Sequence, residues 1–247
     1  MKIKALAGFL VLMSAVSVLS SQNPPAGEIT VVIGEAQLQR PDGRERPLRM
    51  GMSVYQDNII KTGAESKVEI KGFNGGVIRI AELSTVQIQG PDSQDDRKSG
   101  ASVIGGKIWA NMKAVILSDK SSVAFDTPTA TAGIRGTVFR VDVEGDASAT
   151  DVLVYEGKVV VKPEVIEKKQ QGSADPAGER YEVGGPSEIE GPREVSLEEW
   201  ITIVAGQQIR VEQSGNFSTW QFDAKKDSED DWVRYNKERD AALEQGE

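Results

Sequence analysis

The sequence predicts an all-β protein: a single roll-like or sandwich-like domain of short strands with a C-terminal α-helix. Short apolar runs alternate with polar residues from Glu28 to Lys162, and Gly, Pro, Asn or Asp residues bound each run, which is typical of half-buried strands. Asn74-Gly75 lies between two such runs and favours a hairpin turn. Aromatic residues make up only 6% of the chain, so we expect a core of Val, Ile and Ala.

The expected strands follow one another along the β domain, residues 27–162. Their alternating apolar residues are Ile29, Val31 and Ile33; Val68 and Ile70; Ile78 and Ile80; Val86 and Ile88; Phe139, Val141 and Val143; Val152 and Val154; and Val159 and Val161. Arg79, between two of these residues, is expected to point outward. Many short strands at near-regular spacing indicate a sandwich, a barrel or a roll.

Residues 1–20 have the layout of a secretory signal peptide. Lys2 and Lys4 precede an apolar run, residues 5–19, and small residues follow it. This run is short for a membrane span, which takes about 20 apolar residues. We therefore expect a periplasmic or secreted protein that contacts the membrane only if this segment stays uncleaved.

A polar insertion, residues 163–194, interrupts the strand pattern. Its composition buries too little apolar surface to offset the entropy lost on ordering, so we expect a flexible segment. Strand alternation returns in residues 195–213, which we assign to the same domain. Residues 91–100 form a second break and are expected to be an exposed loop.

Residues 227–245 switch to a helical period and predict the C-terminal helix. Ser228 is the expected N-cap, with Asp231 reaching back to it. The helix residues that we expect to cover the β domain, or to contact a partner, share one side of the helix: Trp232, Tyr235, Arg239 and Leu243. A lid over the β domain and a partner site both remain open.

The composition argues against several classes of function. The net charge of −9, from 29 basic and 38 acidic residues, argues against a nucleic-acid-binding surface. The chain has no His and no Cys, which rules out Ser-His-Asp and Cys-His catalysis and thiolate metal sites. Catalysis would have to rest on carboxylates, Lys or Tyr, and paired carboxylates can hydrolyse glycosides. No apolar pocket recognisably flanks any acidic pair, so we expect no enzyme activity and no cofactor. We also expect no metal site, because the acidic loop at Asp92, Asp95 and Asp96 lacks the EF-hand pattern.

The stretch TPTATAGIRGTVF, residues 127–139, interrupts the strand alternation. It is not a phosphate-binding loop, because Gly133 and Gly136 lie too close together and no Lys-Ser/Thr pair follows. The two glycines permit a sharp crossing of the chain. We expect Arg135 to clamp this corner by pairing with a carboxylate or with buried carbonyls; a ligand contact by Arg135, Gly133, Gly136 and Thr137 is the alternative.

Two segments carry a resemblance to a known family. TPTATAGIRGTVFRVDV, followed by VLVYEGKVVV, resembles the signature of the FecR domain, with supporting matches in IIKTGAESKVEI and WVRYNKERDAAL. The resemblance covers about residues 27–243, apart from the insertion. It implies a β domain outside the cytoplasm. In the family's named regulators, a cytoplasmic segment binds a sigma factor, and the outer domain responds to a TonB-dependent receptor of iron uptake.

Two functions follow as expectations. The first is a non-catalytic exported module that binds or assembles with a protein or a glycan of the cell envelope. This one is preferred because only four residues precede the apolar segment, which leaves no cytoplasmic sigma-binding part. The alternative, which the family resemblance implies, is a periplasmic signalling component of TonB-dependent regulation.

Overall fold

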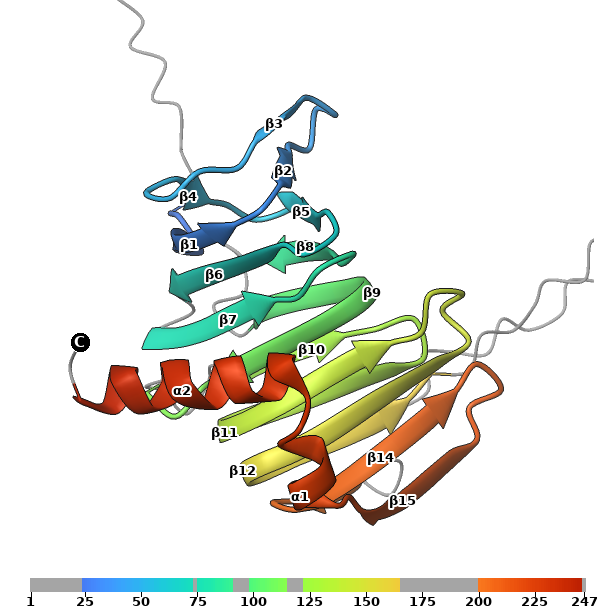
Figure 1. Ribbon diagram of the computed structural model, residues 1–247. Coiled ribbons are helices and arrows are strands. Elements are labelled where there is room, and N and C mark those ends of the chain that lie inside the picture. Colours follow the sequence, from blue (N-terminus) through green and yellow to red (C-terminus); the bar gives the residue numbers. More distant parts are fainter. Residues whose placement is uncertain (1–23, 73–74, 91–97, 115–121, 165–199, 246–247) are drawn as a thin grey trace, which may run out of the picture.

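The computed structural model describes residues 24–72, 75–90, 98–114, 122–164 and 200–245 of the 247-residue chain (Figure 1). The predicted signal peptide, residues 1–20, lies outside these ranges. So do residues 165–194 of the predicted insertion and residues 91–97 of the predicted loop, including its three Asp residues.

Within the described residues the chain forms one sheet of fifteen strands and two helices, which confirms the all-β fold class with a C-terminal helix. The strands are β1 (Gly27–Ile33), β2 (Ala36–Gln39), β3 (Glu45–Pro47), β4 (Ser53–Val54), β5 (Ile59–Thr62), β6 (Lys67–Gly72), β7 (Gly76–Ile80), β8 (Thr85–Gln89), β9 (Lys98–Asn111), β10 (Ser122–Asp126), β11 (Ala130–Val143), β12 (Ala149–Pro163), β13 (Ile201–Val204), β14 (Gln207–Glu212) and β15 (Phe217–Gln221). The helices are α1 (Ala224–Asp227) and α2 (Asp231–Gln245).

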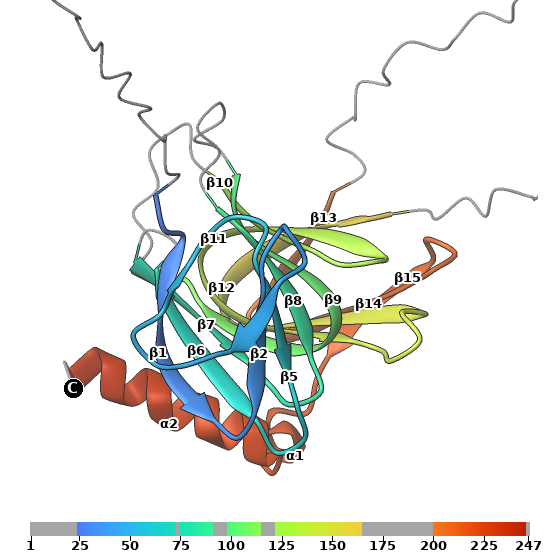
Figure 2. The same ribbon diagram turned by 90° about the horizontal axis from the view of Figure 1, so that it is seen from above.

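The sheet folds back on itself into two layers because its longest strands belong to both. The first half of β9 pairs with β8 and β10, whereas its second half pairs with β7 and β11. β11 likewise exchanges β10 for β9 along its length. Buried residues of both layers, such as Leu38, Ile88 and Val141, pack in one apolar cluster. Figure 2 shows the strands curving around this core, which consists mainly of Ile, Val and Ala as the composition predicts.

The hairpin predicted at Asn74-Gly75 joins β6 and β7. These strands pair antiparallel from Val68 with Ile80 to Gly72 with Gly76. The turn residues 73 and 74 themselves lie outside the described residues.

The stretch 127–139 stops alternating because β11 contains a β-bulge. Gly136 and Thr137 together lie opposite a single residue of β12, Gly157, and the register shifts at this point. Gly136 has a φ of +61°, in the left-handed region that glycine adopts readily. The bulge lies where β11 exchanges β10 for β9, so the predicted corner is a redirection inside one continuous strand.

Threonine hydroxyls hold the turn that precedes β11. The buried Thr129 Oγ1 lies 2.8 Å from Thr150 Oγ1 of β12 and 3.1 Å from the carbonyl oxygen of Val211 in β14. Thr150 donates in turn to Thr127 Oγ1 at 3.0 Å. This network ties the turn to strands that lie on both sides of residues 165–199 in the sequence.

The strands after residue 199 extend the same sheet. β13 pairs with the second half of β12, and β14 pairs with its first half. β15, for which the sequence pattern predicts no strand, pairs with β14 and ends the sheet.

The C-terminal helix begins later than the predicted residue 227. α1 is a single turn, and Ser228 is its C-cap rather than the N-cap of the long helix. α2 begins at Asp231, where the Asp230 carboxylate accepts a hydrogen bond from the backbone N–H of Trp232 at 2.7 Å. α2 lies across the outer face of the sheet, over β7, β9 and β11 (Figure 1).

Candidate functional site

The candidate site is the outer face of β6, β7, β9, β11 and β12 that α1 and α2 cover, here called the helix-covered face. Of the four helix residues predicted to cover the domain, Trp232 is buried, while Tyr235, Arg239 and Leu243 are half-buried. Trp232 packs in a small apolar cluster with Trp109 of β9.

The pattern missed three residues of α2 that contact the sheet. Val233 and Asn236 are completely buried, and the Asp240 carboxylate belongs to an ion cluster described below. Asn236 bonds back to the carbonyl oxygen of Trp232 at 2.7 Å. Polar residues such as Asn and Asp on an amphipathic helix are expected to face solvent. Only the helical spacing of Asn236 and Asp240 from Trp232 could have indicated that they face the sheet.

Four charged side chains form the α2 ion cluster: Glu69 of β6, Arg79 of β7, and Arg239 and Asp240 of α2. Arg79 Nε lies 2.6 Å from Glu69 Oε2, and its Nη1 lies 2.7 Å from Asp240 Oδ1. Arg239 Nη2 reaches Glu69 Oε1 at 2.8 Å. Arg79 is only 1% exposed and Glu69 only 3%, so the outward-pointing Arg79 of the sequence analysis is on the outer face but enclosed beneath α2.

The surroundings keep Glu69 ionised. Burial by itself raises the pKa of this carboxyl, but hydrogen bonds from Arg239, Arg79 and Thr30 outweigh that effect and hold the pKa below its usual range. The Thr30 hydroxyl donates to Glu69 Oε1 at 2.8 Å. The ion cluster therefore joins β1, β6, β7 and α2 through one carboxylate.

A second polar group, the α1 cluster, consists of Arg140 and Asp142 of β11, Tyr155 of β12 and Asp227 of α1. Asp227 accepts a hydrogen bond from Arg140 Nη1 and another from the Tyr155 hydroxyl, both at 2.9 Å. The Asp142 side chain is 20% exposed, and the partial burial of its carboxyl raises its pKa to about 6 although Arg140 and Lys107 oppose the shift. Burial also raises the pKa of the Tyr155 phenol above its usual range.

Buried polar atoms without a hydrogen-bond partner gather on this face. Among the described residues these atoms are Arg79 Nη2, Arg140 Nε, Asp142 Oδ1 and Trp232 Nε1, and all four belong to the sheet or helix side of the helix-covered face. Unpaired buried polar atoms are rare in folded proteins and call for an explanation. The contact between the helices and the sheet is thus polar and incompletely satisfied, unlike the apolar core on the other side.

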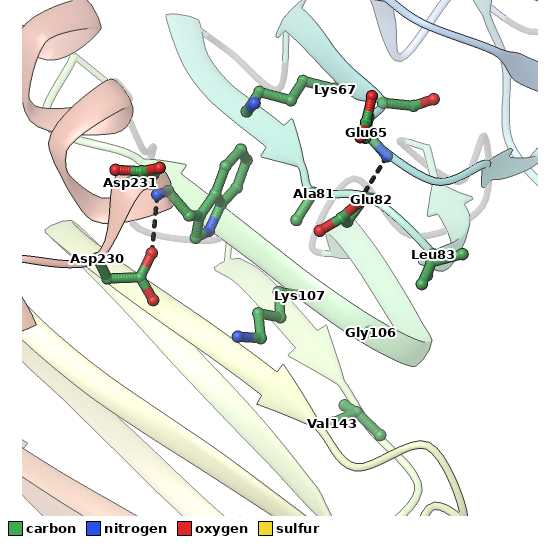
Figure 3. A pocket seen from close by; sticks show the side chains of 12 residues that line it. Glu65, Lys67, Ala81, Glu82, Leu83, Gly106, Lys107, Val143, Asp230 and Asp231 are labelled. Carbon is green, nitrogen blue, oxygen red and sulfur yellow. Dashed lines mark hydrogen bonds between the residues drawn. The ribbon is translucent and has the colours of Figure 1, made fainter.

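A pocket of about 570 Å³ opens where α2 begins. Figure 3 shows Asp230 and Asp231 at the start of the helix, Lys67 and Lys107 on strands of the sheet, and Glu65 and Glu82 on the connections between strands. The Glu82 carboxylate accepts a hydrogen bond from the backbone N–H of Glu65 at 2.5 Å.

The pocket walls carry charges of both signs beside apolar groups. Leu83, Val143 and Trp232 contribute the apolar part of the lining. Because His and Cys are missing from the chain, this lining offers no nucleophile paired with an imidazole base. The arrangement suits the binding of a polar or zwitterionic group.

The predicted residues around Arg135 lie at the bulge of β11, apart from the contacts of the helix-covered face. The side chain of Arg135 is exposed and makes no hydrogen bond or ion pair with another residue of the described ranges. No buried acceptor in these ranges depends on this side chain, so the structure gives the clamp role no support and it stays a prediction. Thr137 holds the bulge: its hydroxyl lies 2.9 Å from the carbonyl oxygen of Lys158 and 3.1 Å from that of Arg135.

The glycines of this stretch differ in their surroundings. A Cβ at Gly133 would lie 3.0 Å from Val160 Cγ2, whereas a Cβ at Gly136 would meet nothing within 4 Å. Ligand binding by Arg135, Gly133, Gly136 and Thr137 stays a prediction.

In the part of the chain that the structure describes, no three acidic side chains gather closely enough to hold a metal ion. Neither helix in that part has the length and the apolar character that a membrane crossing requires.

The centre of the chain matches a known family model. Residues 58–160 match the family model described as FecR protein. No curated protein matches the sequence significantly.

Solved structures align with the chain at low similarity. Two crystal structures of a "putative anti-sigma factor" from Parabacteroides distasonis ATCC 8503 align with a TM-score of 0.47 and 15% identity, over 69% of this chain and 62% of that one. The chain therefore spans less than two thirds of the length of that protein. A "cell surface anchoring domain" aligns with a TM-score of 0.26 and 28% identity, over 26% of this chain and 86% of that one.

Proposed function

We propose that the protein is a signalling component of the cell envelope that binds a protein partner outside the cytoplasm, because residues 58–160 match the family model described as FecR protein. The family match is the observation that carries this proposal. It favours the second of the two functions predicted from the sequence, periplasmic signalling, over a general binding or assembly module.

The choice of a protein partner rests on the same match. FecR regulators act by contact with other proteins, as the resemblance in the sequence implies, and they perform no catalysis of their own. A glycan partner has no comparable support, because among the residues that the structure describes the aromatic residue lining the pocket at the start of α2, Trp232, is buried. Export through the N-terminal segment is part of the proposal.

The helix-covered face supports a role for α2 in signalling. α2 is held to the sheet by buried ion pairs and by few apolar contacts, chiefly those of Trp232 and Val233. A buried ion pair contributes little net stability, since desolvation offsets most of the attraction, yet it fixes one geometry. A contact of this kind is suited to a helix that a partner displaces or tightens, so we assign α2 as the responsive element.

The test measures signalling and partner binding in the same strain. The gene is deleted and then restored either as the parent chain or as the Glu69→Gln variant, and transcripts are compared during iron limitation. We expect deletion to change a defined set of transcripts, the parent chain to restore them, and Glu69→Gln to restore them incompletely because it weakens the contact of α2.

Affinity capture from envelope extract accompanies the transcript measurement. Capture of an outer-membrane receptor by the parent chain, reduced in the variant, is the expected result. Unchanged transcripts in the deletion strain, at a stage when the parent strain makes the protein, would contradict a signalling role. Capture of structural envelope proteins or glycan alone would establish the assembly role instead.

A further inference from the structure

The sheet ends in a strand that lacks the usual protection of an edge. β15 is the last strand of the path, and among the described strands only β14 pairs with it. All five of its residues are exposed, including Phe217 at 50% and Trp220 at 43%. Figure 1 shows it at the outer border of the sheet, beyond β14.

The backbone groups on the free side of β15 can be identified from its pairing. Hydrogen bonds from Glu212 N to Asn216 O and from Phe222 N to Gly206 O mark the bonded pairs at the two ends of the β14–β15 ladder. Bonded pairs recur at every second residue of an antiparallel ladder. The N–H and C=O groups of Phe217, Thr219 and Gln221 therefore point away from β14, to the open edge.

Natural proteins protect such edges with charged residues, proline or very short strands. Another edge of this sheet follows that rule: β3 has the sequence Glu45-Arg46-Pro47. β4 at the end of the path has only two residues. In contrast, residues 213–222 contain neither a charge nor a proline, in a chain of which 27% of residues are charged.

We propose that β15 pairs with β15 of a second copy of this chain, antiparallel about a two-fold axis at Thr219. This register bonds Phe217 with Gln221 of the partner copy and Thr219 with its counterpart, so every outward backbone group on the strand is satisfied. A shift by two residues would leave part of them unpaired. The proposal is independent of the proposed signalling function.

The side chains suit this register. Trp220 stands opposite Ser218 of the second copy, so a large side chain meets a small one at the closely spaced, non-bonded pair. Phe217 lies on the same side of the sheet as Val211, which is buried in the core. The strand of the second copy would cover part of the exposed Phe217 side chain. A two-fold contact of one patch with itself is the commonest way in which identical chains associate.

The fit of β15 to itself, in backbone register and in side-chain size, identifies a second copy as the occupant. With a net charge of −9, two copies repel each other in general, and an uncharged strand is where they approach at least cost.

Oligomeric state of the full chain tests the proposal. A contact of one strand pair is smaller than the roughly 1,200–2,000 Å² of stable interfaces, so we expect a dissociation constant on the order of 10–100 μM. Sedimentation across a concentration range that brackets this value should show a monomer and a dimer in equilibrium. Every variant carries the same N-terminal segment, so association caused by that segment is common to all.

Two variants separate edge pairing from other contacts. Thr219→Pro removes an outward N–H but leaves the bonds to β14 in place, and should weaken association at least about tenfold. Thr219→Ser keeps the N–H and should leave the dissociation constant unchanged. If Thr219→Pro melts at a much lower temperature than the parent, Thr219→Lys is used in its place. In a dimer of Thr219→Lys the two lysines lie opposite each other on the two-fold axis, and their like charges weaken association.

Hydrogen exchange supplies a second readout. The amides of Phe217, Thr219 and Gln221 should exchange more slowly as the protein concentration rises, whereas those of Ser218 and Trp220 are bonded to β14 at all concentrations. A parent chain that stays monomeric throughout the range would overturn the proposal, whether or not another protein binds this edge. A Thr219→Pro dimer as strong as that of the parent would overturn it equally.

Discussion

The buried carboxylate of Glu69 offers the most direct test of how α2 is held. Glu69 accepts hydrogen bonds from Arg79, Arg239 and Thr30 at 2.6, 2.8 and 2.8 Å. Glu69→Gln keeps the shape of the side chain but replaces one acceptor oxygen by an NH₂ group, which turns a donor toward a guanidinium. The positive charge of Arg79 is then left almost completely enclosed with less compensation.

The size of the effect follows from burial. Removing one partner of a buried ion pair costs about 3–5 kcal/mol, and we expect about 3 kcal/mol here because Asp240 still neutralises Arg79. This cost corresponds to a fall in melting temperature of roughly 6–12 °C for a domain of this size. Arg239→Ala is the matched control: the Arg239 side chain is 38% exposed, so its loss should cost at most about 1 kcal/mol.

Urea unfolding followed by circular dichroism measures both variants, and hydrogen exchange separates α2 from the sheet. We expect the amides of α2 to lose protection first in Glu69→Gln, while those of the core strands are affected later. Equal and small losses of stability for Glu69→Gln and Arg239→Ala would refute the view that the enclosed Arg79–Glu69 pair holds the helix.

Three further outcomes follow from single positions. The pKa of Asp142 is about 6 in the folded protein against an ordinary 3.8, so its protonated form stabilises the fold below about pH 4, and this contribution is lost as the pH rises through 6. In urea unfolding, the stability of Asp142→Asn relative to the parent should therefore increase by up to about 3 kcal/mol between about pH 4 and pH 7. A stability difference that is the same at both pH values would contradict this. Gly157→Ala should destabilise the fold more than Gly136→Ala, whose own cost is about 1–2 kcal/mol, because both positions have a positive φ but only a Cβ at Gly157 would meet a backbone oxygen, at 2.7 Å; equal melting temperatures would contradict this. Arg135→Ala should change stability by less than about 0.5 kcal/mol because the side chain is exposed, so a large loss in a thermal melt would support the clamp.

The local pattern of the sequence was sufficient for the fold class but not for the pairing of strands. Alternation with period two reports which face of a strand is buried, and Val141 and Ile88 are indeed core residues. It does not report that β9 and β11 change partners midway, since that depends on strands distant in the sequence. The sequence pattern did not predict β15, because all of its residues are exposed and no buried face produces an alternation of apolar and polar residues.

The candidate site was predicted less completely than the fold. Trp232 was found because an aromatic residue on a helical stripe signals a covered face. Glu69 and Arg79 were not, because a charged residue between apolar ones in a strand indicates solvent, and their burial comes from a helix at the other end of the chain. Arg135 was chosen as a candidate because it lies between two glycines. The structure shows that Gly136 forms part of the β-bulge in β11.

The two faces of the sheet are built for different tasks. On the inner face, Ile70, Ile78 and Ile108 pack without a polar atom among them, and such a surface favours a single compact state because any opening exposes apolar area to water. On the outer face, the same three strands present Glu69, Arg79 and the Trp109 indole, which donates to Asp240 of α2 at 2.8 Å. When α2 leaves the sheet, the charged side chains beneath it become hydrated again. The free energy of separating α2 from the sheet is therefore smaller per unit area than that of opening the apolar core. A helix bound in this way can change its contacts while the domain stays folded, which is what a signalling role requires of it.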